Sequence, residues 1–174
     1  MATRQQHVLV ALVQNRPGVL ARVSGLFRRR GFNIDSLAVG RTDDPDVSRM
    51  TIVVDAQTTA VEQVVKQLYK VIEVLKISEL GSDPSVLTEL ALVKVAATAS
   101  TRGEVIQLAE IYKSKIVDVA AESMIIEITG GEDKIEAFLR LVRPFGIKEM
   151  VRTGTIGMIR GSLFHRVEAL EQAG

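Results

Sequence analysis

Residues 8–20 read Val-Leu-Val-Ala-Leu-Val-Gln-Asn-Arg-Pro-Gly-Val-Leu, an unbroken apolar run that passes through a turn into a helical pattern. The apolar run predicts a buried strand, and apolar residues at helical spacing up to Phe27 predict the helix. Pro17 suits the first helical turn, where its missing N–H costs nothing, and Gly18 lets a backbone or a ligand come close because it has no Cβ. The free N–H groups of such a helix start can bind a carboxylate.

A second informative segment, Gly31-Phe-Asn-Ile-Asp-Ser-Leu37, follows one helix length later. Gly31 is typical of the position just after the end of a helix. Asn33 in this segment and Asn15 in the first each offer a hydrogen-bond donor and an acceptor. Together the two segments could hold a small amino acid, but they contain no group that could attack one. The alternative is that Asn15 only caps the helix and Asn33 only bonds a neighbouring loop.

The order of predicted elements occurs twice along the chain. Apolar periodicity predicts strand, helix, strand, strand, helix and strand before a break at Gly81–Ser85, and the same order after it. This βαββαβ order is the split βαβ, or ferredoxin-like, plan. The sequence therefore predicts an α+β protein with tandem ferredoxin-like domains at 5–81 and 86–161 and a tail at 162–174. The apolar residues of the tail fall on one helical face, which leaves open whether such a helix packs, docks elsewhere or frays.

A four-stranded sheet of this plan has open edges and often one face without helices. Several residues of the predicted strands are too apolar to face only water: Val8, Val10, Leu12, Ile34, Leu37 and Val39. We expect a second copy of the chain to cover them, which predicts a homodimer with a pocket between the copies. Such pairing could bring the Asn33 strand of one copy near the Asn15 loop of the other.

Composition excludes several classes of function. The chain of 174 residues has no cysteine, which excludes disulfides, thiolate metal sites and cysteine nucleophiles. Its net charge of +1 and its aromatic content of 4% give no reason to expect a nucleic acid or an anionic membrane as partner. No apolar run is long enough to cross a bilayer, and the first residues lack the apolar core of a signal peptide. We therefore expect a cytoplasmic protein.

Catalytic and metal-binding groups are scarce. His7 and His165 are the only histidines, and His165 with Glu168 one helical turn away would supply two metal ligands at most. The cluster Asp43–Asp46 predicts a turn, because the glycine and the distal glutamate of a calcium loop are absent. Gly154–Gly161 lacks the lysine of a phosphate-binding loop. The sequence therefore predicts neither a catalytic nor a metal site.

Three segments carry a resemblance to a known family: Asn15-Arg-Pro-Gly-Val-Leu-Ala-Arg-Val23, Arg29-Arg-Gly-Phe-Asn-Ile-Asp-Ser-Leu37 and Ser48-Arg-Met-Thr-Ile52. They closely resemble the small regulatory subunit of acetolactate synthase, also called acetohydroxyacid synthase. The similar region extends from about Val8 to Gly161. The resemblance implies an N-terminal ACT domain followed by a C-terminal ferredoxin-like domain.

The resemblance also implies a function and a site. In this family the ACT domains dimerise and bind valine, or another branched-chain amino acid, between the subunits. One chain would contribute the loop residues Asn15, Pro17, Gly18, Val19 and Leu20, and the other chain would contribute Asn33 and Ile34. The subunit would activate a separate catalytic subunit and confer feedback inhibition in valine, leucine and isoleucine biosynthesis. No cofactor is implied in this chain, since thiamine diphosphate, magnesium and FAD belong to the catalytic partner.

Two other classes of function are compatible with a pair of ferredoxin-like domains. A free-standing enzyme would need turnover by the isolated chain, and the scarcity of catalytic groups argues against it. An RNA-binding pair would need exposed aromatic residues and a basic sheet face, whereas the predicted strands carry few aromatic residues, Phe32 being the exception. The sequence favours a non-catalytic regulatory subunit.

Overall fold

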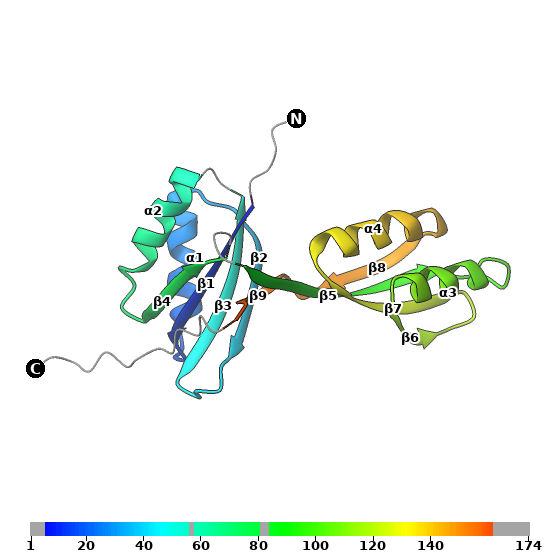
Figure 1. The fold of residues 1–174 in the computed structure, drawn as a ribbon, viewed down its shortest axis with the longest axis horizontal. Helices are drawn as coiled ribbons and strands as arrows, with labels where there is room; N and C mark the ends of the chain where they lie inside the picture. Colours follow the sequence, from blue (N-terminus) through cyan, green and yellow to red (C-terminus); the bar gives the residue numbers. More distant parts are fainter. Residues whose placement is uncertain (1–5, 56–57, 81–83, 162–174) are drawn as a thin grey trace, which may run out of the picture. The chain divides into compact units, whose positions relative to one another are not determined.

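The computed structural model describes residues 6–55, 58–80 and 84–161. The chain divides into two compact units (Figure 1): residues 87–156 form one, and the described residues before 87 and after 156 form the other. Each unit has the order βαββαβ with antiparallel strands, which confirms the predicted α+β class. Residues 157–161, which we expected in the second domain, group with the first. The predicted tail, 162–174, lies outside the described residues.

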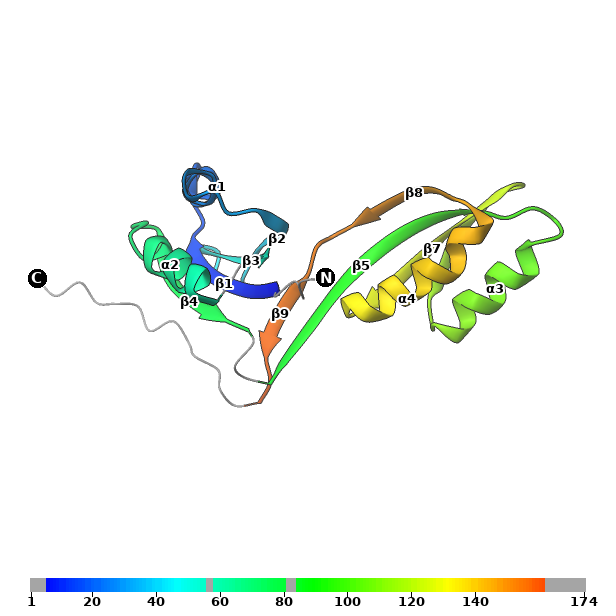
Figure 2. The same cartoon turned by 90° about the horizontal axis from the view of Figure 1, so that it is seen from above.

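The first unit is a four-stranded sheet with two helices. Its elements are β1 (Gln6–Gln14), α1 (Val19–Arg30), β2 (Ile34–Arg41), β3 (Val47–Asp55), α2 (Thr58–Leu68) and β4 (Val74–Glu79). The strand order is β2-β3-β1-β4, so β2 and β4 are the edges. Both helices cover the same face of the sheet (Figure 2), because α1 and α2 share one buried cluster with alternate residues of the strands.

The second unit repeats this plan. Its elements are β5 (Ser85–Ala96), α3 (Arg102–Ile111), β6 (Lys115–Val119), β7 (Ser123–Gly130), α4 (Glu132–Val142), the 3-10 turn η1 (Arg143–Phe145) and β8 (Ile147–Arg152). The strand order is β6-β7-β5-β8, and a last short strand, β9 (Ile156–Ile159), also pairs with β5. The apolar faces of α3 and α4 pack on one face of this sheet and form a separate core. Each unit therefore has its own hydrophobic centre.

The helix-free face of the first sheet is covered differently from our prediction. Val8 and Val10 form a buried cluster with Val53 and Leu80, and Ile159 of β9 packs against this cluster. The chain therefore supplies its own cover, because β9 returns to the first unit. The expectation that a second copy must bury Val8 and Val10 was wrong.

The other apolar residues that we expected to need a partner are also mostly covered within the chain. Ile34 and Leu37 are partly buried and pack against the core under the helices, and Leu12 is half-buried. Val39, on the edge strand β2, has 46% of its surface exposed. Burial of these apolar residues therefore does not require a dimer. The evidence for a dimer is sought in the geometry of the site.

Candidate functional site

The start of α1 is accessible, and neither a capping side chain nor an acidic residue of its first turn offsets the positive end of its helix dipole. Gly18, at the N-terminal boundary of α1, has φ +86°, a left-handed conformation that favours glycine. No side chain caps α1, and its first turn contains no acidic residue. The N–H of Arg22 donates to the Gly18 carbonyl at 3.0 Å, so the N–H groups of Leu20 and Ala21 precede the helical ladder. This helix start can therefore accept an anion.

There is also space at this helix start. A Cβ built on Gly18 would meet no atom within 4 Å, and the loop residues before it are exposed. The side chains after it divide between core and surface: Val19 is 3% exposed and packs in the core, whereas Leu20 is 44% exposed. Val19 therefore anchors the loop, and Leu20 is the apolar side chain that the loop presents outward.

Asn15 ties this loop to the turn between β2 and β3. Its backbone N–H donates to the Asp46 carbonyl at 2.7 Å, and its side-chain amide donates to the Pro45 carbonyl at 2.9 Å. The turn itself closes by a hydrogen bond from the Asp46 N–H to the Asp44 carboxylate at 2.9 Å. This agrees with the prediction that the acidic cluster forms a turn. Asn15 is thus held by the turn, with its side-chain oxygen unbonded among the residues that the structure describes.

Asn33 and Ile34 lie at the start of the edge strand β2. The Asn33 side chain is exposed and donates to the Asp35 carboxylate at 2.8 Å. Ile34 is half-buried and packs against the core of the first unit. Within the described part of the chain, neither residue is hydrogen-bonded to the Asn15 loop.

Strand register shows that one chain cannot bring the two halves of the predicted site together. Gln14, just before the loop, pairs with Val47 at the start of β3, whereas Ile34 pairs with Val54 near its end. These two positions of β3 differ by seven residues (54 − 47), which is roughly 23 Å along a strand. The loop and Asn33 therefore lie at opposite ends of the same sheet.

The one histidine within the described residues makes a structural contact. His7 is 7% exposed, and its Nδ1 lies 2.7 Å from Oε1 of Glu79 on the neighbouring strand β4. His7 is thus a buried structural residue, while His165 and Glu168 lie outside the described residues. Within the described ranges, no group of three or more acidic or histidine side chains could hold a metal ion.

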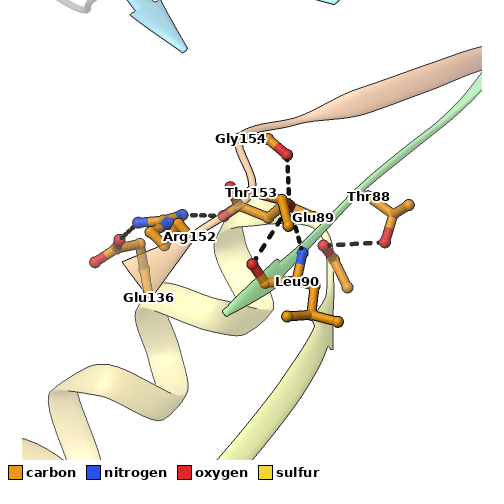
Figure 3. Close-up of polar contacts among 8 residues, drawn as sticks. Thr88, Glu89, Leu90, Glu136, Arg152, Thr153 and Gly154 are labelled. Carbon is orange, nitrogen blue, oxygen red and sulfur yellow. Dashed lines mark hydrogen bonds and ion pairs between the residues drawn. The ribbon is translucent and has the colours of Figure 1, made fainter. Parts of the chain in front are cut away.

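Sequence reasoning missed a charged cluster in the second unit (Figure 3). Arg152 bonds to the Glu136 carboxylate at 2.7 Å and to Glu89, whose side chain is 5% exposed. Burial lowers the pKa of Arg152, but the hydrogen bonds and charges of the two carboxylates outweigh burial and raise it above its ordinary value. The cluster joins β5, β8 and α4, which are distant in sequence, so no local pattern could have revealed it.

Beside this cluster, Thr153 joins β8 to β5 through hydroxyl bonds. Its Oγ1 accepts the Leu90 N–H at 3.1 Å and contacts the Leu90 carbonyl at 3.4 Å (Figure 3). The Thr88 hydroxyl donates to the Gly130 carbonyl at 3.3 Å. These contacts fasten strands together, so we assign the cluster a structural role.

One more cation was not anticipated. Arg49 of β3 donates to the Gly157 carbonyl at 2.6 Å, and burial lowers its pKa. This bond fastens the segment that carries β9 to the first sheet.

Among the helices of the described segments, none has the length and apolar character to cross a membrane.

Comparison with known proteins gives a consistent picture. A family model described as an acetohydroxyacid synthase small subunit-like ACT domain matches residues 9–76, and a model described as the small subunit of acetolactate synthase matches residues 88–161. A probable acetolactate synthase small subunit of Archaeoglobus fulgidus is 55% identical over 157 residues, which cover 90% of this chain and 98% of the relative. The acetolactate synthase small subunit of Mycolicibacterium smegmatis is 53% identical over 155 residues, 89% of this chain and 91% of the relative.

A solved structure extends the similarity to three dimensions. The crystal structure of an acetolactate synthase small subunit from Thermotoga maritima superposes with a TM-score of 0.84 and 42% sequence identity. The superposition covers 91% of this chain and 99% of the other. Sequence and fold therefore match over the same, nearly complete, length.

Proposed function

This chain belongs to the family of acetolactate synthase small subunits, and we propose that it binds valine, or another branched-chain amino acid, between the ACT domains of two copies. A small subunit implies a large catalytic partner. We propose that the chain activates this partner and inhibits it when the amino acid is bound, while contributing no catalytic group of its own. Two sites coupled through one dimer are sufficient for such regulation.

The observation that carries the proposal is the separation of the two half-sites within one chain. β1 and β2 are both antiparallel to β3, so the Asn15 loop and Asn33 lie at opposite ends of the sheet. Each end has groups suited to an amino acid, but neither end is a complete site. A two-fold axis that relates two copies would place one end of each beside the other end of its partner.

The edge strand β2 offers the geometry for this arrangement. An exposed edge strand carries unpaired backbone groups and can pair with a second copy of itself. Antiparallel pairing of two β2 strands would place Ile34 of the second copy at the end where Arg41 lies. Arg41 pairs with Ser48, and Ser48 pairs with Val13, which leads into the loop. The bonds from Asn15 to the β2–β3 turn hold the loop toward this edge.

The chemistry of the two half-sites matches a free amino acid. The open start of α1 suits the ligand carboxylate, because its N–H groups and dipole are uncompensated. The side-chain oxygens of Asn15 and Asn33 can accept hydrogen bonds from the ammonium group. The exposed Leu20 and the half-buried Ile34 offer apolar contact for a branched side chain.

Titration calorimetry of the whole chain with valine, leucine and isoleucine tests the ligand, and sedimentation in parallel gives the oligomeric state. Two-fold symmetry predicts two equivalent sites per dimer, hence one ligand per chain. 2-Ketoisovalerate, which lacks the ammonium group, is the matched control and should bind weakly. A strictly monomeric chain, or no heat of binding with any of the three amino acids, would contradict the proposal.

A mixing experiment tests whether each site draws on both copies. Gly18→Asp damages the helix start and Asn33→Ala damages the other half-site, so each variant alone should bind valine poorly. In a mixed dimer, the unmutated Gly18 of one copy meets the unmutated Asn33 of the other, and one of the two sites is intact. Mixing the two variants, with subunit exchange verified, should therefore restore binding to about a quarter of the sites for random pairing. No restoration would show that the site does not lie between copies.

A further inference from the structure

We infer that Glu73 is a positioning residue that fixes the shape of the ligand loop, defined here as residues 15–18. This inference rests on the proposed function, because it assigns Glu73 a role in amino-acid binding. Glu73 lies just before β4, far from the loop in sequence, and belongs to neither half-site. The structure nevertheless connects it to the chain on both sides of the loop.

The first connection precedes the loop. The backbone carbonyl of Glu73 accepts the N–H of Gln14, the last residue of β1, at 2.8 Å. This bond continues the pairing of β1 with β4 up to the residue just before the loop. The position of the residue from which the loop starts is therefore set by the backbone of Glu73.

The second connection follows the loop. The Glu73 carboxylate accepts a hydrogen bond from the guanidinium of Arg22, and the backbone N–H of Arg22 donates to the Gly18 carbonyl at 3.0 Å. Long side chains in helices point back toward the helix N-terminus, so Arg22 extends over the turn that contains Gly18. Glu73 thus fastens α1 at the point where the loop ends.

The charge of Glu73 offsets the charge of Arg22 at the start of α1. A cation near a helix N-terminus is unfavourable to the helix dipole, and the first turn of α1 contains no acidic residue to offset Arg22. Glu73 provides that anion from another part of the chain. Its residue exposure is 8%, and its Oε2 is buried without a hydrogen-bond partner among the described residues. Arg22 is therefore the ion-pair partner of a carboxylate that water reaches poorly.

The pair is asymmetric, which gives a specific expectation. The side chain of Arg22 is 60% exposed, whereas that of Glu73 is 11% exposed. Removing the arginine charge leaves a buried anion without compensation, but removing the glutamate charge leaves a cation that water can solvate. Arg22→Gln should therefore disturb the loop more than Glu73→Gln, and Arg22→Lys, which keeps the charge, should restore most of the wild-type behaviour.

Amide hydrogen exchange without ligand tests loop fixation directly. In Glu73→Gln we expect exchange at the amide of Arg22, which is hydrogen-bonded to the Gly18 carbonyl, to rise about tenfold, with the core strand β1 unchanged. The matched control is Glu136→Gln, which removes a carboxylate from the arginine cluster of the second unit and should leave this amide unaffected. Because this measurement needs no amino acid, it tests Glu73 even if wild-type protein binds no valine, which would contradict only the proposed function.

Calorimetry with valine then tests the link to binding. If the loop must become ordered when valine binds, the cost of ordering it lowers the affinity. We therefore expect the valine Kd of Glu73→Gln to rise about tenfold. The valine Kd of Glu136→Gln should stay unchanged. Arg22→Lys should stay near the wild-type Kd. Equal exchange rates in Glu73→Gln and Glu136→Gln, or faster exchange of all amides in proportion, would overturn the inference. Faster loop exchange with unchanged valine affinity would overturn it as well.

Discussion

The charge at the start of α1 can be tested by placing a carboxylate there. Gly18→Asp introduces the same chemical group that we assign to the ligand, on the residue that precedes the free N–H groups. Gly18→Asn is the matched control, because asparagine has the same shape and also tolerates the left-handed conformation of this position. A side chain fits at this site without steric conflict, since a Cβ would meet nothing within 4 Å. The two variants therefore differ in charge alone.

The expected magnitudes follow from the geometry. Both variants should lower the free energy of unfolding by about 1 kcal/mol, because φ of +86° is unfavourable for residues with a Cβ. Two carboxylates about 4 Å apart repel by about 4 kcal/mol at the effective dielectric constant near a protein surface. Gly18 is exposed, so salt and water reduce this to about 2 kcal/mol. Gly18→Asp should therefore bind valine about 30-fold more weakly than Gly18→Asn.

The assay is calorimetric titration of both variants with valine, with thermal unfolding measured in parallel. Raising the salt concentration should narrow the difference between the variants, because a repulsion between exposed charges is screened. The unfolding midpoint of Gly18→Asp should equal or slightly exceed that of Gly18→Asn, because a carboxylate at the helix start interacts favourably with the helix dipole. Equal valine affinity for Gly18→Asp and Gly18→Asn would refute the assignment of the ligand carboxylate to the start of α1.

Three further predictions concern other parts of the chain. Asn33→Ala should raise the valine Kd about tenfold, the effect of losing a hydrogen bond to a charged group, while activation of the catalytic subunit in an enzyme assay persists; loss of activation at unchanged Kd would contradict this. In thermal unfolding, Arg152→Leu should cost about 3 kcal/mol because it leaves a buried carboxylate unpaired, whereas Glu136→Gln should cost under about 1 kcal/mol; equal costs would refute this asymmetry. A chain ending at residue 155 lacks β9, so it should bind more of a hydrophobic fluorescent dye than the full chain. Its free energy of unfolding should fall by about 2 kcal/mol. A chain ending at residue 161 keeps β9 and serves as the control.

Elements whose limits depend on nearby residues were predictable. The helix α1 ends where Gly31 adopts φ +71° and the N–H of Phe32 bonds to the Phe27 carbonyl at 3.1 Å. The strand β4 shows the limit of this reasoning. The apolar pattern of residues 71–80 predicts a strand that begins at Val71, but β4 begins at Val74. Val71 and Val74 instead make turn hydrogen bonds, Val71 to the Leu68 carbonyl and Val74 to the Val71 carbonyl. An apolar run shows that a segment is buried but does not show where a turn gives way to a strand.

The candidate site divides in the same way. The loop that ends at Gly18 and the Asn33 segment were both recognisable, because each is a short stretch of distinctive residues next to a helix end. The ion pair between Arg22 and Glu73 was not recognisable, because the two residues come together only when β4 pairs with β1. Contacts between residues far apart in sequence depend on strand neighbours and register, which local patterns do not contain.

The sequence by itself determined the repeated βαββαβ order, the C-terminal end of α1 and the two segments suited to an amino acid, since each depends on residues within a few positions of one another. The helix start was misplaced, because α1 begins at Val19 and Pro17 lies in the turn before it. The tertiary structure decided that these two segments lie at opposite ends of one sheet and that β9 covers the face we had expected a second copy to cover. The physical reason is that strand order and strand register are set by packing across the whole unit. The same register that separates the half-sites in one chain is the basis for expecting a complete site between two.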